Sequence, residues 1–375
     1  MASVSLTNVS KIYPGKNGRD VTAVNDLALE IQDREFVVLV GPRNCGISSI
    51  VRMIAGLDDI SKGDIFIGDR RVNDMPPKDH AIAMVSQNYV PYPRMSVYEN
   101  LAFGLKLRKF PNSEIKKRVL AAAGILGLQE LLERKSESLS SEQRQRVAIA
   151  RAIALQPKVF LFDEPLANLE AKRGGQMRNE IAKLHQRLQV TMIYATHDPI
   201  EAMAMGSRVV VIDAGVVQQD GTALSLYDKP ANSLVAEFVG PPMNLVQGTL
   251  KHERDSLVFS EREGGTIEVR LPISEFPGPR DFAGGLVLLG IRPEDIEIAK
   301  FTKVTEKHLG SFPAIVDLVE PMGKEANLYL QTGAHTVVCR SQRQVDNREA
   351  GHRLQFELNV EKVCLFDPIS RRRIT

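Results

Sequence analysis

The chain has 375 residues, 43% of them hydrophobic and 25% charged, and its 48 Lys and Arg residues nearly balance 46 Asp and Glu residues. This length predicts roughly two to three domains of ordinary globular composition. The net charge of +2 argues against a nucleic-acid binder that relies on bulk positive charge. The three cysteines are too scattered for a disulfide framework or a zinc site, which favours a reducing cytoplasm.

Neither a secretion signal nor a membrane span is expected from the sequence. The N-terminal stretch lacks a basic start followed by an apolar core. No apolar run approaches the roughly 18 residues that are needed to span a bilayer. We therefore expect a cytoplasmic protein that reaches a membrane only through a partner.

The first part of the chain, residues 1–235, alternates short apolar runs with helical patterns such as Ser113–Leu126 and Ile181–Leu188. The apolar runs are β-branched or aromatic, as expected of strands that are buried on both faces. They are Phe36–Val40, Ala81–Val85, Val159–Phe162, Thr191–Thr196 and Val209–Ile212. This alternation predicts an α/β domain with a parallel sheet.

The texture changes at the Pro-Pro-Met-Asn segment of residues 241–244. Residues 236–375 read as short strands separated by turn residues such as Gly264 and Gly265. The predicted strands are Leu257–Ser260, Thr266–Leu271, Leu286–Leu289, Ala314–Leu318, Asn327–Leu330, Thr336–Cys339 and Val360–Leu365. Many short strands with no long helix predict a small β-barrel or sandwich.

The strand Phe36–Val40 leads into a loop with the frame G-x-x-x-x-G-x-S, which an apolar helix pattern follows. We call residues 41–49 the phosphate loop; they are Gly41, Pro42, Arg43, Asn44, Cys45, Gly46, Ile47, Ser48 and Ser49. Such a loop turns backbone N–H groups toward an anion, and the N-terminus of the next helix adds partial positive charge. The hydroxyl of Ser48 stands where it could hold Mg²⁺.

This loop is a degenerate Walker A motif, because Ile47 replaces the lysine expected directly before the serine. The lysine would place a cation beside the β- and γ-phosphates, which Ile47 cannot do. Arg43 is a cation that could swing toward the phosphates. Asn44 replaces a common glycine, and asparagine tolerates a positive φ better than most residues. The loop alone fits a nucleotide site and an empty strand–helix turn equally well.

Polar residues follow other predicted strands. Asp163 and Glu164 come directly after Val159–Phe162, and Gln87 comes after Ala81–Val85. Ligand sites of parallel sheets open at the carboxyl ends of the strands. There, Asp163 and Gln87 could bind Mg²⁺, and Glu164 could polarise an attacking water. Each residue taken alone is more simply a solvated loop residue.

Two further residues are compatible with a nucleotide site. His197 ends the strand Thr191–Thr196, where its ring could contact a γ-phosphate. Tyr13 could stack its ring on a base. A structural histidine and a packing tyrosine are the simpler interpretations when each residue is considered alone.

In combination and in this order, these features resemble the ATP-binding subunits of ABC transporters. The resemblance covers the whole chain and is densest in residues 87–100, 143–152 and 161–166. The C-terminal strings at 290–295 and 319–323 are similar to the regulatory β-domain of the subgroup that serves maltose, glycerol-phosphate and other carbohydrate importers.

The resemblance implies a P-loop (RecA-like) nucleotide-binding domain at residues 1–235, with a helical subdomain at about 90–150, and an OB-like all-β regulatory domain at 236–375. It implies ATP and Mg²⁺ as ligands and a homodimer that sandwiches ATP between its subunits. It also implies transmembrane permease subunits as partners, with peripheral attachment to the cytoplasmic face of the cell membrane and no nucleic acid.

The resemblance also implies roles for particular residues. Tyr13 stacks on adenine, and the phosphate loop from Gly41 to Ser49 cradles the phosphates. Ser140 and Gln143, in the signature segment (residues 139–143), meet the nucleotide of the partner subunit. Residues 87–100 contact the membrane subunit.

The metal and the reaction are assigned in the same way. The resemblance implies that Ser48, Gln87 and Asp163 organise Mg²⁺. Glu164 is then the catalytic base, and His197 contacts the γ-phosphate.

The signature segment departs from the Leu-Ser-Gly-Gly-Gln of the family, because Ser141 and Glu142 replace its glycines. Ser140 and Gln143 fit a capping box at the start of a helix. Glu142 would stabilise that helix by ~0.3–1 kcal/mol, but it would repel an incoming phosphate by roughly 1–4 kcal/mol. We therefore expect weakened ATP-driven closure of the dimer.

A third departure follows the acid pair, where Glu170 replaces an aspartate and Gly174 and Gly175 weaken a helical stretch. The chain thus keeps the residues that activate water but lacks those that clamp the phosphates. We expect a nucleotide-binding importer subunit with impaired hydrolysis. The alternative is a pseudo-ATPase that acts as a structural or regulatory module.

Overall fold

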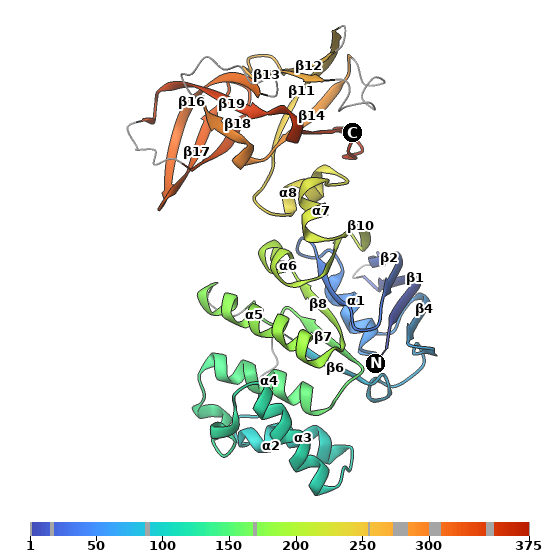
Figure 1. The fold of residues 1–375 in the computed structure, drawn as a ribbon. Coiled ribbons are helices and arrows are strands. Elements are labelled where there is room, and N and C mark those ends of the chain that lie inside the picture. The colour runs from blue at the N-terminus through green and yellow to red at the C-terminus, as the bar shows by residue number, and fades with distance from the viewer. Residues whose placement is uncertain are drawn as a thin grey trace. The chain divides into compact units, whose positions relative to one another are not determined.

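The computed structural model describes residues 2–15, 19–86, 91–167, 171–253, 256–272, 284–299, 309–342 and 349–374. Its contacts divide the chain into two compact units, Met1–Ala223 and Leu224–Thr375 (Figure 1). The boundary proposed after residue 235 falls inside α8 (Ser233–Phe238), which belongs to the second of these units.

The first unit is built on a six-stranded sheet with the order β10-β9-β3-β8-β7-β6. Its strands are β3 (Phe36–Val40), β6 (Ile82–Ser86), β7 (Val159–Asp163), β8 (Thr191–Thr196), β9 (Arg208–Asp213) and β10 (Val216–Gly221). All pairs are parallel except β10 with β9. Every residue of β3 and β8 is buried, as strands covered on both faces require. The predicted α/β domain is confirmed.

A second, antiparallel sheet of four strands has the order β2-β1-β4-β5. Its strands are β1 (Val4–Tyr13), β2 (Val21–Ile31), β4 (Lys62–Ile67) and β5 (Arg70–Arg71). The sequence did not predict this sheet. Its side chains share one hydrophobic core with the central sheet and with α1 (Ile47–Ile54), which lies between the two sheets (Figure 1).

The helix α1 presents Ile47, Ile50, Val51 and Ile54 to this core at helical spacing. Figure 1 shows α5 (Ala171–Leu188) and α6 (Pro199–Met205) on the opposite side of the central sheet. The central sheet is therefore covered on both faces, with the phosphate loop at the start of α1.

Three helices, α2 (Val97–Leu107), α3 (Asn112–Ile125) and α4 (Ser141–Ala154), contact one another and form a helical layer. Ser96 begins α2 with a capping box, and Ser140 begins α4 in the same way. Short 3₁₀ turns at Gln129–Leu131 and Ser136–Ser138 lie between α3 and α4. This layer coincides with the segment predicted as a helical subdomain.

The second unit starts within α7 (Ala223–Asp228), continues with α8, and then forms two five-stranded antiparallel sheets, β13-β12-β11-β14-β20 and β15-β19-β16-β17-β18. The strands are β11 (Asn244–Glu253), β12 (Ser256–Glu261), β13 (Glu268–Pro272), β14 (Leu286–Ile291), β15 (Ile296–Ile298), β16 (Leu309–Met322), β17 (Glu325–Gln331), β18 (Thr336–Ser341), β19 (Arg353–Asn359) and β20 (Cys364–Phe366). Both sheets contribute to one hydrophobic core. The predicted all-β domain is confirmed.

The prediction of one strand over Val360–Leu365 is wrong in its first half. Val360–Lys362 form a 3₁₀ turn, whose start is capped by the Asn359 side chain, which accepts a hydrogen bond from the backbone N–H of Glu361 at 3.0 Å. An apolar run of this length does not distinguish a turn from a strand. The cap by Asn359 stabilises the turn here.

Arg292 ties the two short helices to the β-sheets of the second unit. One terminal nitrogen of its buried guanidinium donates to the carbonyl oxygens of Ala236, Val239 and Pro241 at 2.9–3.0 Å, and the other donates to that of Tyr227 at 3.0 Å. The Tyr227 ring lies 4.0 Å from the guanidinium carbon. Burial lowers the pKa of Arg292 to about 10.

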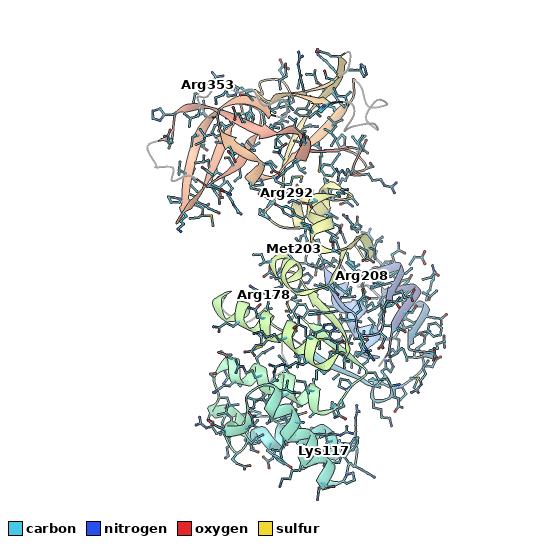
Figure 2. The ribbon with its side chains drawn as sticks, viewed as in Figure 1. Lys117, Arg178, Met203, Arg208, Arg292 and Arg353 are labelled. Atoms are coloured by element: carbon cyan, nitrogen blue, oxygen red, sulfur yellow. The ribbon has the colours of Figure 1, made fainter. Side chains whose placement is uncertain are left out.

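We predict that Arg292→Met unfolds the second unit at lower urea concentration. Two buried and two partly buried carbonyls would lose a donor. Each buried unsatisfied group costs about 1–3 kcal/mol, so a loss of at least about 2 kcal/mol is expected. Circular dichroism during urea denaturation measures this loss in the free energy of unfolding. Arg353→Met removes an exposed arginine from another part of the same unit (Figure 2), and should leave the transition unchanged. Equal effects of both substitutions would contradict this role of Arg292.

Candidate functional site

The phosphate loop forms a tight turn between β3 and α1. Gly46 is the N-cap of α1 with φ 102°, and Asn44 has φ 66°. Asn44 therefore adopts the positive φ that asparagine was expected to tolerate at this position. A Cβ atom on Gly41 would collide with the carbonyl oxygen of Ile212, and one on Gly46 with that of Ala23. Only glycine fits these two positions.

Two side chains of the loop point into the protein. Ile47 is 1% exposed and packs in the hydrophobic core between the sheets. Cys45 is buried as well, and burial raises the pKa of its thiol, which leaves it in the unreactive neutral form. Arg43, in contrast, is exposed. The position that would carry the lysine is therefore occupied by core packing.

The hydroxyl of Ser48 meets the acid pair at the end of β7. Its Oγ donates to Oδ1 of Asp163 at 3.1 Å. Burial raises the pKa of the Asp163 carboxyl, and the hydrogen bond from Ser48 opposes that rise. Glu164 follows with φ 48°, and its N–H donates to the carbonyl of Ala195 at 2.9 Å. The loop and the acid pair are thus in direct contact through Ser48 and Asp163.

His197 joins the phosphate loop to Glu164. Its Nδ1 lies 2.7 Å from the carbonyl oxygen of Gly41. Because a carbonyl only accepts hydrogen bonds, Nδ1 carries the proton. Nε2 lies 3.5 Å from Oε1 of Glu164. The ring is therefore held with Nε2 beside the candidate base.

A buried network that the sequence did not reveal supports this histidine. The hydroxyl of Thr196 accepts from the backbone N–H of Asp198 at 3.0 Å and donates to Oε2 of Glu201 at 2.8 Å. The hydroxyl of Tyr194 donates to the same oxygen at 2.8 Å. Burial raises the pKa of Glu201. The network fixes the backbone on both sides of His197.

Tyr13 lies beside the phosphate loop. Its hydroxyl is 3.2 Å from Oγ of Ser49 and donates to Asp58 at 2.9 Å. Arg52 binds the same carboxylate through two nitrogens at 2.8 and 3.0 Å. Burial raises the pKa of Tyr13, and the bond from Arg52 lowers that of Asp58. The Nζ of Lys11 lies 4.8 Å from the centre of the Tyr13 ring.

The signature segment caps α4. Oγ of Ser140 accepts from the N–H of Gln143 at 3.2 Å, and the Gln143 side chain accepts from the N–H of Ser140 at 3.0 Å. This capping box was predicted and is confirmed. Gln145 of α4 donates to the carbonyl of Pro165 at 2.7 Å, and Pro165 directly follows Glu164.

Glu142 is held in an ion-pair network. Its carboxylate lies 3.0 Å from a terminal nitrogen of Arg146, and the same nitrogen lies 2.5 Å from Glu180 of α5. The sequence pointed to Glu142 but not to these partners. The spacing of Glu142 and Arg146, four residues apart in one helix, was the available signal.

Some predicted residues lie outside the described ones, namely Gln87 and Asn168 to Glu170. Among the described residues from Pro91 onward, the buried Asn100 organises the turn before α2. Its amide nitrogen donates to the carbonyls of Tyr92 and Ser96 and to the hydroxyl of Ser136 at 2.9–3.1 Å. Its amide oxygen accepts from the N–H of Tyr92 at 2.8 Å.

The oxygen atoms at this site suit Mg²⁺. The ion prefers oxygen ligands and keeps several waters and substrate phosphates in its shell. The Ser48 hydroxyl and the Asp163 carboxylate are such ligands and already touch each other. Nowhere in the described parts of the chain do three or more His, Cys, Asp or Glu residues gather as a metal site on their own.

A glycine-bounded loop between a buried strand and a helix, with an acid pair at the end of β7 and a histidine at the end of β8, defines a P-loop nucleotide-binding protein. Family models agree: one described as "ABC transporter" matches residues 24–167, "MalK OB fold domain" matches 240–296, and "TOBE domain" matches 289–366.

Relatives match over the full length. The chain is 44% identical to the trehalose/maltose import ATP-binding protein MalK of Thermococcus litoralis and 45% identical to the oligosaccharides import ATP-binding protein MsmX of Bacillus subtilis, with 100% of both chains covered in each case. It is 43% identical to the sn-glycerol-3-phosphate import ATP-binding protein UgpC of Escherichia coli, again over 100% of both. The chain belongs to the family of ABC transporter ATP-binding proteins.

Solved structures match the first unit. The dimeric post-hydrolysis state of the ATP-binding cassette MJ0796, bound to ADP and Pi, has a TM-score of 0.52 at 29% identity and covers 58% of this chain and 98% of that one. The protein cbiO1 of Clostridium perfringens, part of the ABC transporter complex cbiONQ, has a TM-score of 0.53 at 26% identity and covers 58% and 88%.

We predict that Asp163→Asn stabilises the protein at pH 7. Because the folded pKa is raised, the folded state holds the proton more tightly, and stability falls as pH rises from the ordinary value of 3.8 through the folded pKa. Asparagine avoids this loss and keeps an oxygen that accepts from Ser48. A gain of about 0.5–2 kcal/mol in the free energy of unfolding is expected.

Denaturant titrations at several pH values measure this gain, which should vanish at acidic pH, where the carboxyl is protonated in both states. Asp69→Asn changes an exposed aspartate and serves as the control. A gain that stays constant down to acidic pH would show that charge burial is not its cause.

Proposed function

We propose that this protein is the ATP-binding subunit of an importer for sugars or related solutes such as glycerol phosphate. The relatives named above are import proteins for trehalose or maltose, oligosaccharides and sn-glycerol-3-phosphate, and they align with both units of the chain. The second unit matches the MalK OB fold domain. A regulatory β-domain of this kind is what distinguishes the carbohydrate-importer subgroup that the sequence resembles. Solute choice would lie with the partner subunits.

The proposed assembly is a homodimer docked on transmembrane permease subunits at the cytoplasmic face of the membrane. None of the described helices is both long enough and apolar enough to cross a bilayer. The similar cassette MJ0796 is described as dimeric, and cbiO1 is described as part of a transporter complex. In such a dimer, Ser140 and Gln143 would face the nucleotide of the partner subunit, and residues 87–100 would contact the permease.

The proposed ligands are ATP and Mg²⁺. The backbone of Gly41 to Ser49 and the N-terminus of α1 would hold the phosphates, and Tyr13 would stack on adenine. Ser48, Asp163 and Gln87 would hold Mg²⁺, which supplies positive charge that neutralises the phosphates. The single observation that carries this proposal is the direct contact of Ser48 with Asp163 beside the loop.

Water activation would fall to Glu164 and His197. The Glu164 carboxylate would accept a proton from the attacking water. His197 would contact that water or the γ-phosphate through Nε2, because Nδ1 donates to the Gly41 carbonyl. A contact with a γ-phosphate oxygen, which only accepts, would require Nε2 to donate as well. These two groups lie 3.5 Å apart and are ready for such chemistry.

We propose that hydrolysis is nevertheless impaired. Ile47 places a buried methyl-bearing side chain where a cation is needed, and it is fixed there by core packing. Ser141 and Glu142 add bulk and negative charge at the start of α4. The loss of one preorganised donor typically slows a reaction by about 10²–10³-fold. A pseudo-ATPase with a structural or regulatory role is the second candidate, favoured by the burial of Ile47.

We predict that phosphate release from Mg-ATP by the purified protein is no faster than that by its Glu164→Gln variant. The triple repair Ile47→Lys, Ser141→Gly, Glu142→Gly should restore the clamp and raise the rate by at least about a hundredfold. A repaired protein that also carries Glu164→Gln is the control, and it should be inactive.

Equilibrium binding of Mg-ATP separates the two candidate functions. Binding without turnover by the unaltered protein supports a nucleotide-binding subunit with silenced hydrolysis. Release well above the Glu164→Gln level by the unaltered protein would contradict impairment, and Arg43 or the loop backbone would then supply the clamp. A repaired protein that binds no ATP would contradict the nucleotide site itself.

A further inference from the structure

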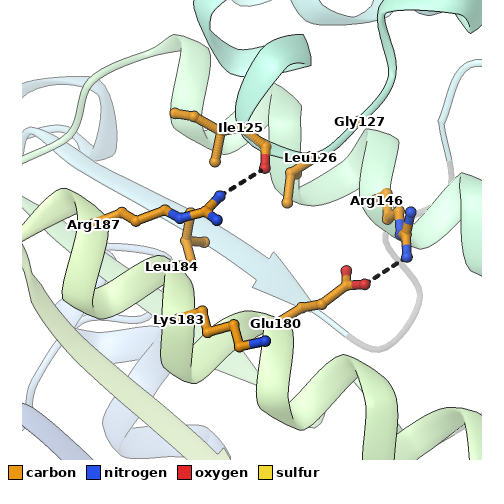
Figure 3. A pocket seen from close by; sticks show the side chains of 8 residues that line it. All are labelled: Ile125, Leu126, Gly127, Arg146, Glu180, Lys183, Leu184 and Arg187. Atoms are coloured by element: carbon orange, nitrogen blue, oxygen red, sulfur yellow. Dashed lines mark hydrogen bonds and ion pairs between the residues drawn. The ribbon is translucent and has the colours of Figure 1, made fainter.

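A pocket of about 280 Å³ lies between the helical layer and α5, away from the phosphate loop (Figure 3). Its walls come from the end of α3 and the turn after it, from α4 and from α5. The lining residues are Ile125, Leu126, Gly127, Arg146, Glu180, Lys183, Leu184 and Arg187. None of them belongs to the phosphate loop or to the acid pair.

The charges of this pocket are predominantly positive. Arg146, Lys183 and Arg187 line it, against the single acid Glu180. Glu180 is already engaged, because its carboxylate lies 2.5 Å from Arg146. Arg187 donates only a long hydrogen bond of 3.4 Å, to the carbonyl of Ile125, and within the described residues no partner is found for Lys183. Lys183 and Arg187 are both exposed and are thus accessible to a ligand in the pocket.

Arg146 adds an independent observation. Its Nε is buried and has no hydrogen-bond partner among the described residues, although a terminal nitrogen binds Glu142 and Glu180. Because Nε is fully buried, a ligand in the open pocket would meet the terminal nitrogens of Arg146 and not Nε.

We propose that this pocket binds a small dianion, namely phosphate or a compact phosphate monoester. Arginine and lysine are the side chains that recognise phosphate oxygens. The volume is just below the range of about 300–1,000 Å³ that is usual for drug-sized ligands, so the ligand is small. Leu126 and Leu184 provide an apolar wall for a short carbon chain. This site goes beyond the nucleotide site of the proposed function.

The position of the pocket gives the ligand a structural consequence. Arg146 belongs to α4, which begins with the signature segment, while Lys183 and Arg187 belong to α5. A bound dianion contacts both helices and competes with Glu180 and Glu142 for Arg146. Ligand occupancy therefore acts on the helix that carries the signature segment.

The test is equilibrium dialysis of the full chain with radiolabelled inorganic phosphate at constant ionic strength, without nucleotide. The pocket variant is Lys183→Gln with Arg187→Gln. The control variant is Lys116→Gln with Lys117→Gln, which removes the same charge from exposed positions of α3 that do not line the pocket (Figure 2 shows Lys117). We expect the unaltered protein and the control to bind equally and the pocket variant to bind at least tenfold more weakly.

Three results would overturn the proposal. The first is no binding by the unaltered protein. The second is equal weakening in both variants, which would indicate general attraction by positive charge. The third is full binding by the pocket variant, which would place the phosphate at the phosphate loop. Each exchanged residue is exposed, and the single variants Lys183→Gln and Arg187→Gln repeat the test if the double variant does not fold. Glycerol phosphate added as a competitor distinguishes a monoester site from one that takes only free phosphate.

The result does not depend on the nucleotide site. Saturating Mg-ADP should leave phosphate bound to the pocket, because the two sites share no residue. The unaltered protein could bind phosphate but no nucleotide, while the pocket variant loses phosphate binding. That result would contradict the proposed function and would still support this inference.

Discussion

The candidate site depends on one hydrogen bond, from Nδ1 of His197 to the carbonyl of Gly41. It joins the loop after β3 to the end of β8, which pairs with β3 in the central sheet. The bond requires Gly41 to lie close to Ile212, where no Cβ fits. It places a proton on Nδ1 and holds the ring with Nε2 3.5 Å from Oε1 of Glu164. Loop, histidine and base are therefore positioned as one unit by the sheet.

Against this preserved scaffold, the clamp residues have been replaced by groups that serve the fold. Ile47 adds to the core between the two sheets, where a lysine would have to carry its charge out to the loop. Glu142 lies at the N-terminus of α4 and pairs with Arg146, and both interactions stabilise that helix. Each of these side chains thus contributes to local stability, and under the proposed impairment of hydrolysis this would come at the expense of phosphate binding.

The sequence predicted what depends on local pattern. The strands β3 and β8 match their predicted bounds, because continuous burial on both faces gives an uninterrupted apolar run. The sheet with β1 was missed, since its burial pattern is irregular and its pairing with β2 contains register shifts. Spacing located the phosphate loop and the acid pair. Glu201 and Glu180 were missed because their roles come from contacts made only in the folded chain, and Gln87 stays a prediction.

The contacts of α4 explain why the departures at the signature segment and the rest of the site are not independent. Gln145 binds the carbonyl of Pro165 next to Glu164, and Arg146 binds Glu180 of α5. Glu142 and Glu180 pair with the same terminal nitrogen of the Arg146 guanidinium. Replacing Glu142 by glycine therefore does more than remove a charge that repels phosphate, because it leaves Arg146 to Glu180 alone and strengthens the link between α4 and α5. The charge at residue 142 therefore acts on the start of α4 and, through Arg146, on the contact of that helix with α5.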